Sequence, residues 1–86
     1  YFSLYVCSPN PAESMIGIRY STAFKTRISV QIYNSYGVLC GKAVDAVLPA
    51  GAYETAFDVS GFTPGVYYVR MRAGIFSQTK ILTVSR

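Results

Sequence analysis

The stretch GVYYVRMRAG, residues 65–74, carries the clearest fold signal in the chain. From Tyr67 to Arg72 its apolar and polar side chains alternate, and a glycine stands at each end. Alternation with a period of two is typical of a β-strand that buries one face, and glycine gives the backbone the freedom that turns need. The stretch therefore predicts an amphipathic strand with Arg70 and Arg72 facing outward.

The next segment, IFSQTKILTVSR, residues 75–86, is predicted to pair with this strand as a terminal hairpin. We take Ala73-Gly74 as its two-residue loop. One face then holds Tyr67, Val69, Met71, Phe76, Leu82 and Val84, and the other holds Tyr68, Arg70, Arg72, Ser77 and Thr79. The same count directs Gln78 and Lys80 toward the core. We expect them at its rim, with long stems reaching outward, or a bulge that resets the register.

Five further segments show strand patterns, and clusters of turn residues separate them. The segments are residues 1–7, a strand from residue 15 with Ile16, Ile18 and Tyr20 inward, 27–33 with Ile28, Val30 and Ile32 inward, 38–44, and 52–59 with Tyr53 and Phe57 as core anchors. The turns are residues 8–11, 34–37 with Gly37 expected at positive φ, 48–51 and 60–65.

Residues 38–44 give the weakest strand pattern, because Gly41 and Lys42 interrupt it, so we expect an edge position or a bulge there. Seven short strands with turns at this spacing predict an all-β fold, an immunoglobulin-like antiparallel β-sandwich of about seven strands. The Cys, Trp, Cys pattern of antibody domains is missing.

Composition limits what such a domain does. The 86 residues are expected to form one domain, and with 51% apolar and 14% charged residues the chain predicts a soluble, packed structure with no membrane span. The net charge of +4 is scattered, which argues against a nucleic-acid partner. Because the sequence starts at Tyr1, without an initiator Met, we interpret it as a piece of a longer protein or a processed form.

Residues that would support catalysis or metal binding are few. The chain has no histidine, which excludes a histidine base and the usual zinc ligand sets, and it has no phosphate loop or calcium loop, so no cofactor is expected. Glu54 and Asp58 are predicted on a solvated face. Cys7 and Cys40 are either a disulfide pair or two buried thiols, and we favour buried thiols. We therefore predict that the domain is not an enzyme.

Tyrosine is abundant, with eight residues. An exposed row of Tyr33, Tyr36 and Tyr68 would suit stacking on sugars or bases, although tyrosine also fits a half-buried sheet surface in general, and we favour that simpler interpretation. A carbohydrate-binding or adhesive β-sandwich module of a secreted enzyme is the alternative function that this row suggests.

Four segments, read in order, closely resemble the type A C-terminal sorting domain of the type IX (Por) secretion system of Bacteroidota. They are SPNPAES, ISVQIYNSYGVLCGKAV, LPAGAYETAFDVSGFTPGVYYVRMRAG and FSQTKILTVSR. The resemblance covers nearly the whole chain. The matching motifs are Pro9-Asn10-Pro11, Ile32-Tyr33-Asn34 with Gly37, Gly65-Val66-Tyr67, Ala73-Gly74, and Thr79-Lys80 followed by an apolar strand to Val84.

The resemblance implies a non-catalytic C-terminal address label on an exported passenger protein. After crossing the inner membrane, the domain would pass through the periplasm, be bound by the outer-membrane translocon, and typically be removed by a sortase-type peptidase at the cell surface. Most motif residues are expected to build the fold that is recognised. Direct contact with the machinery is expected from four cations for which ordinary solubility is an equally good explanation: Arg70, Arg72, Lys80 and Arg86.

Overall fold

The computed structural model describes residues 2–7 and 14–84, and the described chain is all-β. Its seven strands are β1 (Ser3–Cys7), β2 (Met15–Thr22), β3 (Thr26–Asn34), β4 (Leu39–Leu48), β5 (Gly51–Asp58), β6 (Gly65–Ala73) and β7 (Phe76–Val84). Every pairing is antiparallel. No described segment forms an apolar helix long enough to cross a bilayer.

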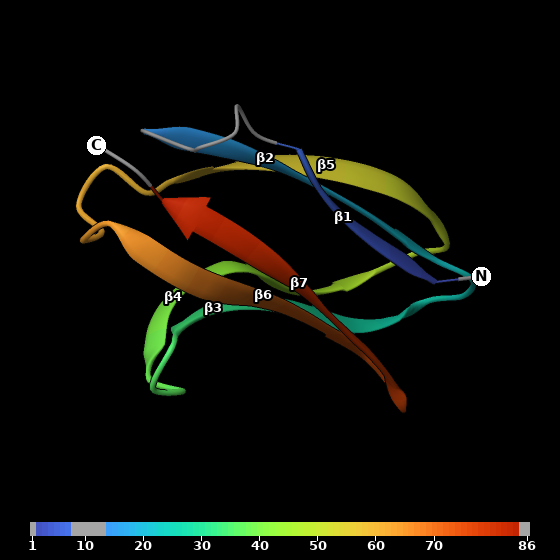
Figure 1. Ribbon diagram of the computed structural model, residues 1–86. Coiled ribbons are helices and arrows are strands. Elements are labelled where there is room, and N and C mark those ends of the chain that lie inside the picture. The colour runs from blue at the N-terminus through green and yellow to red at the C-terminus, as the bar shows by residue number, and fades with distance from the viewer. Residues whose placement is uncertain (1, 8–13, 85–86) are drawn as a thin grey trace.

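The strands form two sheets that face each other across the core, so the predicted sandwich is confirmed (Figure 1). One sheet has the order β1-β2-β5 and the other the order β4-β3-β6-β7. The chain changes sheet three times, between β2 and β3, between β4 and β5, and between β5 and β6. In constant-type immunoglobulin domains the fourth strand pairs with the fifth, whereas here β4 pairs with β3.

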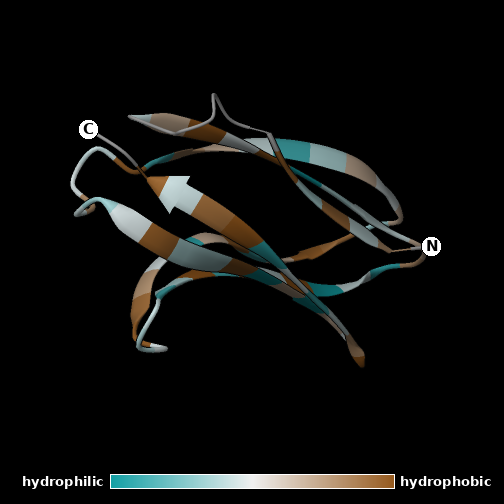
Figure 2. Ribbon diagram, in the orientation of Figure 1, coloured by the Kyte–Doolittle hydropathy of each residue, from teal (hydrophilic) through white to brown (hydrophobic). Residues whose placement is uncertain are grey.

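The core lies between the inner faces of the sheets and follows the predicted alternation. Ile28, Val30 and Ile32 of β3 are fully buried, and the alternate residues of the same strand are more exposed. Bands of opposite hydropathy accordingly follow one another along the strands (Figure 2). Tyr53 and Phe57 of β5 are half-buried and pack against this core from the edge. Burial of one face per strand supplies most of the driving force for the sandwich.

Strand β4 is both an edge strand and an irregular one, as its interrupted pattern predicts. Its register against β3 shifts between Val30 and Gln31 and again between Ile32 and Tyr33. It runs from Leu39 to Leu48, four residues beyond the predicted end, because Pro49 and Ala50 alone make the turn to β5. The first strand begins at Ser3, later than predicted, and Tyr1 lies outside the described residues.

Candidate functional site

The terminal hairpin of β6 and β7 has the longest uninterrupted pairing among the described residues, with nine consecutive residue pairs from Gly65–Val84 to Ala73–Phe76. Its loop is Gly74-Ile75, so the predicted loop Ala73-Gly74 is wrong by one residue. Gly74 has φ +61° and is followed by a residue with negative φ, which is the pattern of a type II′ turn. Such a turn requires glycine at its first central position, and Gly74 occupies that position.

The inner face of the hairpin has the predicted composition. Tyr67, Val69 and Met71 of β6 are buried, and β7 adds Leu82 and Val84. No bulge interrupts β7, so Gln78 and Lys80 point to the same side and lie half-buried at the rim of the core. Of the two outcomes expected for them, the rim position is confirmed.

Gln78 joins the hairpin to the other sheet. Its Oε1 accepts a hydrogen bond of 3.1 Å from the backbone N–H of Leu4 in β1. Close by, the ring of Phe2 stacks on that of Phe76, with centroids 5.0 Å apart. The beginning of the described chain is therefore fixed against the last strand by one polar and one aromatic contact. The inward-facing amide of Gln78, unfavourable on the sequence pattern alone, has a specific hydrogen-bond partner.

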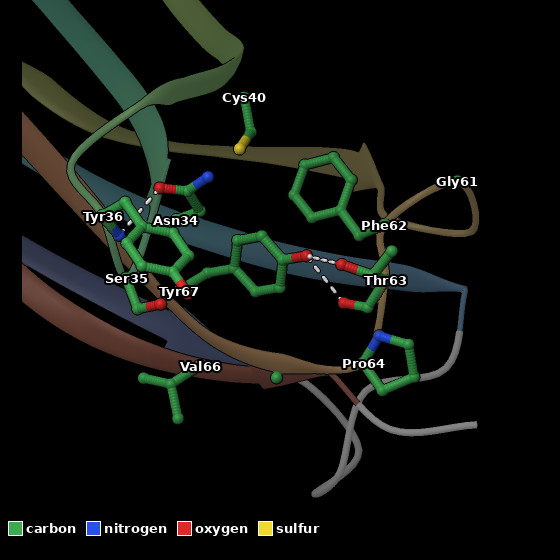
Figure 3. Close-up of a pocket in the computed structure, with 11 residues that line it drawn as sticks. Asn34, Ser35, Tyr36, Cys40, Gly61, Phe62, Thr63, Pro64, Val66 and Tyr67 are labelled. Atoms are coloured by element: carbon green, nitrogen blue, oxygen red, sulfur yellow. Dashed lines mark hydrogen bonds between the residues drawn. The ribbon is translucent and has the colours of Figure 1, made fainter.

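Tyr67 holds the entry of β6 in place (Figure 3). The hydroxyl donates to the backbone carbonyl of Thr63 over 2.6 Å and lies 3.1 Å from the Thr63 hydroxyl, while the ring packs 4.8 Å from that of Phe62. A tyrosine near the start of a strand that bonds back to the preceding turn is the tyrosine corner of immunoglobulin-like sandwiches. Sequence reasoning placed the ring of Tyr67 in the core and missed the role of its hydroxyl.

A hollow of about 640 Å³ lies beside this corner, between the turn from β3 to β4 and the loop before β6 (Figure 3). Asn34 organises the turn, since its Oδ1 accepts from the N–H groups of Tyr36 and Val38 over 2.9 and 3.0 Å. Cys40 also lines the hollow and is an exposed free thiol, so the expectation that it is buried is wrong, because it sits at a register irregularity of β4. The side chain of Cys7 lies outside what the structure describes.

The outer face of the hairpin carries cross-strand rows that end on β7. Tyr33, Tyr68 and Ile81 form one row, and Gln31, Arg70 and Thr79 form the next. Tyr36 is 90% exposed and lies in the turn after β3, at the hollow of Figure 3. Tyr33 and Tyr68 therefore lie side by side, and Tyr36 does not stand in their cross-strand row.

Positive charge dominates the hairpin. Arg70 and Arg72 are exposed, and the Arg70 Nε donates to the Ser77 hydroxyl over 3.2 Å, so its side chain leans across β7. Neither arginine forms an ion pair within residues 2–7 and 14–84. The ion pairs of the described residues lie elsewhere. Arg19 of β2 pairs with Glu54 of β5, and Asp45 of β4 pairs with Arg27 of β3 and with Lys42 of its own strand.

The remaining motif residues fall at turns or outside the described chain. Gly37 and Gly65 have positive φ angles of +81° and +151°. Pro9, Asn10, Pro11 and Arg86 lie outside the described residues, so the structure places none of them. Among the described motif residues, Gly37, Gly65 and Gly74 lie at turns or a strand start, whereas Lys80 lies within β7 on its inner face. The candidate contacts Arg70 and Arg72 lie together on the outer face.

Chemically active groups are sparse within the described chain. No three His, Cys, Asp or Glu side chains gather there into a possible metal site. Burial raises the pKa of the Tyr20 phenol above its ordinary value, and the neighbouring Tyr53 adds to that rise. The two rings stack with centroids 5.5 Å apart in the three-stranded sheet. This pair bears on stability, and it lies in the sheet opposite the hairpin.

Comparison with known proteins supplies the identity of this fold. A search of the curated proteins returns no match. The family model described as secretion system C-terminal sorting domain matches residues 6–85. That match spans the sandwich from the end of β1 through the terminal hairpin, and includes the turn of Asn34 and Gly37 and the corner of Tyr67. The chain therefore belongs to the type IX secretion C-terminal sorting domain family.

Proposed function

We propose that this domain directs a passenger protein through the outer-membrane translocon of a type IX secretion system. The observation that carries the proposal is the family match over residues 6–85. The geometry is compatible with a recognition role, because the described motif residues build a regular terminal hairpin whose outer face is cationic. Family membership supports a C-terminal secretion sorting signal, and such domains are generally non-catalytic.

The proposal extends to the route and the fate of the domain. The 86 residues act as a single domain at the C-terminal end of a longer exported protein of a Bacteroidota cell. The domain crosses the periplasm with its passenger, reaches the cell surface, and is removed there by a sortase-type peptidase. Arg70, Arg72, Lys80 and Arg86 are the proposed contacts with the machinery. The cationic hairpin supports this assignment for Arg70 and Arg72, because exposed charges with no ion partner in the described part of the chain are available to a partner protein.

The test is a transplantation experiment. Residues 1–86, placed behind a fluorescent carrier with an N-terminal export signal, are expected to bring the carrier to the surface or the medium of a type IX-competent bacterium. The measurement is protease-accessible fluorescence on intact cells together with fluorescence in the medium. The carrier without the domain, and the full fusion in a strain without the translocon, are the controls. A carrier that stays in the periplasm would show that the domain is not a sufficient sorting signal.

A second form of the fusion tests the hairpin. Removing residues 75–86 deletes β7 and leaves the edge of β6 unpaired, so surface delivery is expected to be lost. Because this deletion also harms the fold, the charge variant Arg72→Gln is made beside it, since Arg72 is exposed and its loss removes no buried contact. Reduced delivery by a stably folded Arg72→Gln domain supports direct recognition of that arginine, and unchanged delivery assigns it to solubility alone.

A further inference from the structure

The edges of the two sheets are unequally protected against pairing with another strand. Natural sheets protect their edges with bulges, charges and short strands. β4 has two register irregularities and lies beside the ion pairs of Asp45. β1 is only five residues long, and β5 carries Glu54 and Asp58. β7 has nine residues, a regular register and no proline, so it is the least protected of the four edges.

The outer backbone groups of β7 have no hydrogen-bond partners within the part of the chain that the structure describes. β7 pairs with β6 on one side only. β1 lies across from it in the other sheet, and their one hydrogen bond uses the side chain of Gln78, which leaves the backbone of β7 untouched. Ile81, midway along β7, is 67% exposed. An extended segment therefore has both a row of backbone donors and acceptors and an apolar neighbour to pack on.

Positive charges flank this edge from both sheet faces. Arg70 reaches over β7 on the outer face, where its Nε contacts the Ser77 hydroxyl. Lys80, the one charged side chain of β7, lies half-buried on the inner face. Because successive side chains of a strand point to opposite faces, a strand added beside β7 places one set of alternate side chains near Arg70 and the other set near Lys80. A neutral strand would cover Lys80 without neutralising it, and a basic strand would be repelled, whereas acidic side chains compensate both charges.

We propose that the edge of β7 is a strand-addition site for an extended segment that carries acidic side chains on both of its faces. The segment would extend the four-stranded sheet beyond β7 and place its carboxylates near Lys80 and Arg70. The assignment of this segment to the export machinery rests on the proposed function. Its acidic, extended character is inferred from the unpaired edge of β7 and from the cations beside that edge. A second copy of this domain is a poor occupant, because pairing two β7 strands would bring together two hairpins that each carry Arg70, Arg72 and Lys80 with no acidic residue.

The test uses a synthetic strand with the purified domain, residues 1–86. The probe is a capped peptide as long as β7 in which pairs of glutamates alternate with pairs of threonines. Glutamates then lie on both faces of the strand, and threonine favours extended structure. Saturable binding is expected, and hydrogen exchange of the domain should slow at the β7 amides and remain unchanged in β4 and β5. A peptide with lysine in place of glutamate, and a glutamate peptide with alternate backbone amides methylated, should not bind. Failure of the glutamate peptide to bind, or protection of another edge, overturns the proposal.

Variants of the domain separate this site from general electrostatics. Lys80→Met keeps the apolar stem and Arg70→Gln keeps a polar group, and each is expected to weaken the glutamate peptide about fivefold, as for loss of a well-formed exposed ion pair. Lys42→Gln, at an exposed position of β4 on the opposite edge of the same sheet, removes the same charge away from β7 and should leave binding unchanged. Equal weakening by all three variants contradicts a specific site. Thermal unfolding verifies that each variant is folded.

Failure of this proposal is distinguishable from failure of the sorting function. A domain that delivers the fluorescent carrier but does not bind the acidic peptide overturns the strand-addition site and leaves the sorting function intact. A domain that binds the peptide through β7 but leaves its carrier in the periplasm contradicts the sorting function alone. In a delivering fusion, Lys80→Met and Arg70→Gln are expected to lower the yield at the surface relative to Lys42→Gln.

Discussion

Gly41 sets how closely the edge strands β4 and β5 approach each other. A Cβ atom built at this position would lie 2.6 Å from Cζ of Phe57, closer than side-chain carbons pack. Phe57 is half-buried against the core and is held on its other side by Phe62, with ring centroids 6.0 Å apart. Gly41→Ala is therefore expected to lower the free energy of unfolding by about 1 to 3 kcal/mol, as other overpacking substitutions do, measured by urea denaturation.

Gly61→Ala is the matched control for this prediction. A Cβ atom at Gly61 meets nothing within 4 Å, so the substitution should cost no stability. It should raise the free energy of unfolding by up to about 1 kcal/mol, because alanine lowers the conformational entropy of the unfolded chain. Phe57→Leu, with a shorter side chain, is expected to recover part of the loss when combined with Gly41→Ala. Equal stability of the two alanine variants would show that the ring of Phe57 moves aside freely.

Single residues also show where sequence reasoning stops. The apolar ring of Tyr67 belongs to an alternating run, so its burial follows from the sequence alone. Its hydrogen bonds to Thr63 do not, because they depend on how the preceding turn brings a carbonyl under the strand. Cys40 is a second case. A cysteine in a strand pattern is ordinarily buried, but a register irregularity in β4 turns this one outward.

At the scale of the element, the hairpin shows that a hydropathy pattern determines faces more firmly than register. Moving the loop from Ala73-Gly74 to Gly74-Ile75 shifts every pair by two residues, and a shift of two returns each side chain to the same face. The faces were therefore predicted correctly from a wrong loop. Turn chemistry decides between the registers, since glycine at the first central position gives a type II′ turn. The irregularity of β4 was predictable because Gly41 and Lys42 break its pattern.

Gln78 is the element-scale link between β7 and β1, and its removal gives a local prediction. Gln78→Ala leaves the N–H of Leu4 without its acceptor next to a buried side chain, which is expected to cost about 1 to 2 kcal/mol of stability. Hydrogen exchange at the Leu4 amide should accelerate. Gln78→Glu replaces the amide oxygen by a carboxylate oxygen at the same reach, so the backbone N–H of Leu4 should remain protected from exchange. The exposed neighbour Thr79→Ala is the control, and faster Leu4 exchange in that variant would assign the effect to β7 as a whole.

At the scale of the molecule, aromatic contacts close both ends of the sandwich. Phe2, Phe24 and Phe76 meet at the end where the hairpin turns, with centroid separations of 5.3 and 5.0 Å from Phe2. Phe57, Phe62 and Tyr67 meet at the other end. The number of strands and the two-layer architecture were predictable from alternation and turn spacing. The partnership of Phe2 with Phe76 was not, because no local pattern records which strands of opposite sheets meet.

The stability of the whole sandwich is expected to depend on the ionisation of Tyr20 in alkaline solution. Burial in the three-stranded sheet, assisted by Tyr53, raises its pKa above the ordinary value of 10.0, so the folded protein holds this proton more tightly than the unfolded chain does. The contribution of the protonated Tyr20 hydroxyl to the free energy of unfolding is therefore complete below pH 10.0. It is lost as the pH rises through the folded pKa, because the unfolded chain ionises first. The slope is at most about 1.4 kcal/mol per pH unit for one group.

Urea denaturation of the wild type and of Tyr20→Phe, from about pH 8 to about pH 11, measures this contribution as the difference between two curves. Phenylalanine keeps the ring that stacks on Tyr53 and removes the ionisable hydroxyl, so the variant should lose less stability above pH 10.0 than the wild type. Tyr36→Phe, at a side chain 90% exposed, should follow the wild type throughout. Parallel curves for Tyr20→Phe and the wild type would mean that the Tyr20 hydroxyl ionises as readily in the folded sandwich as in the unfolded chain.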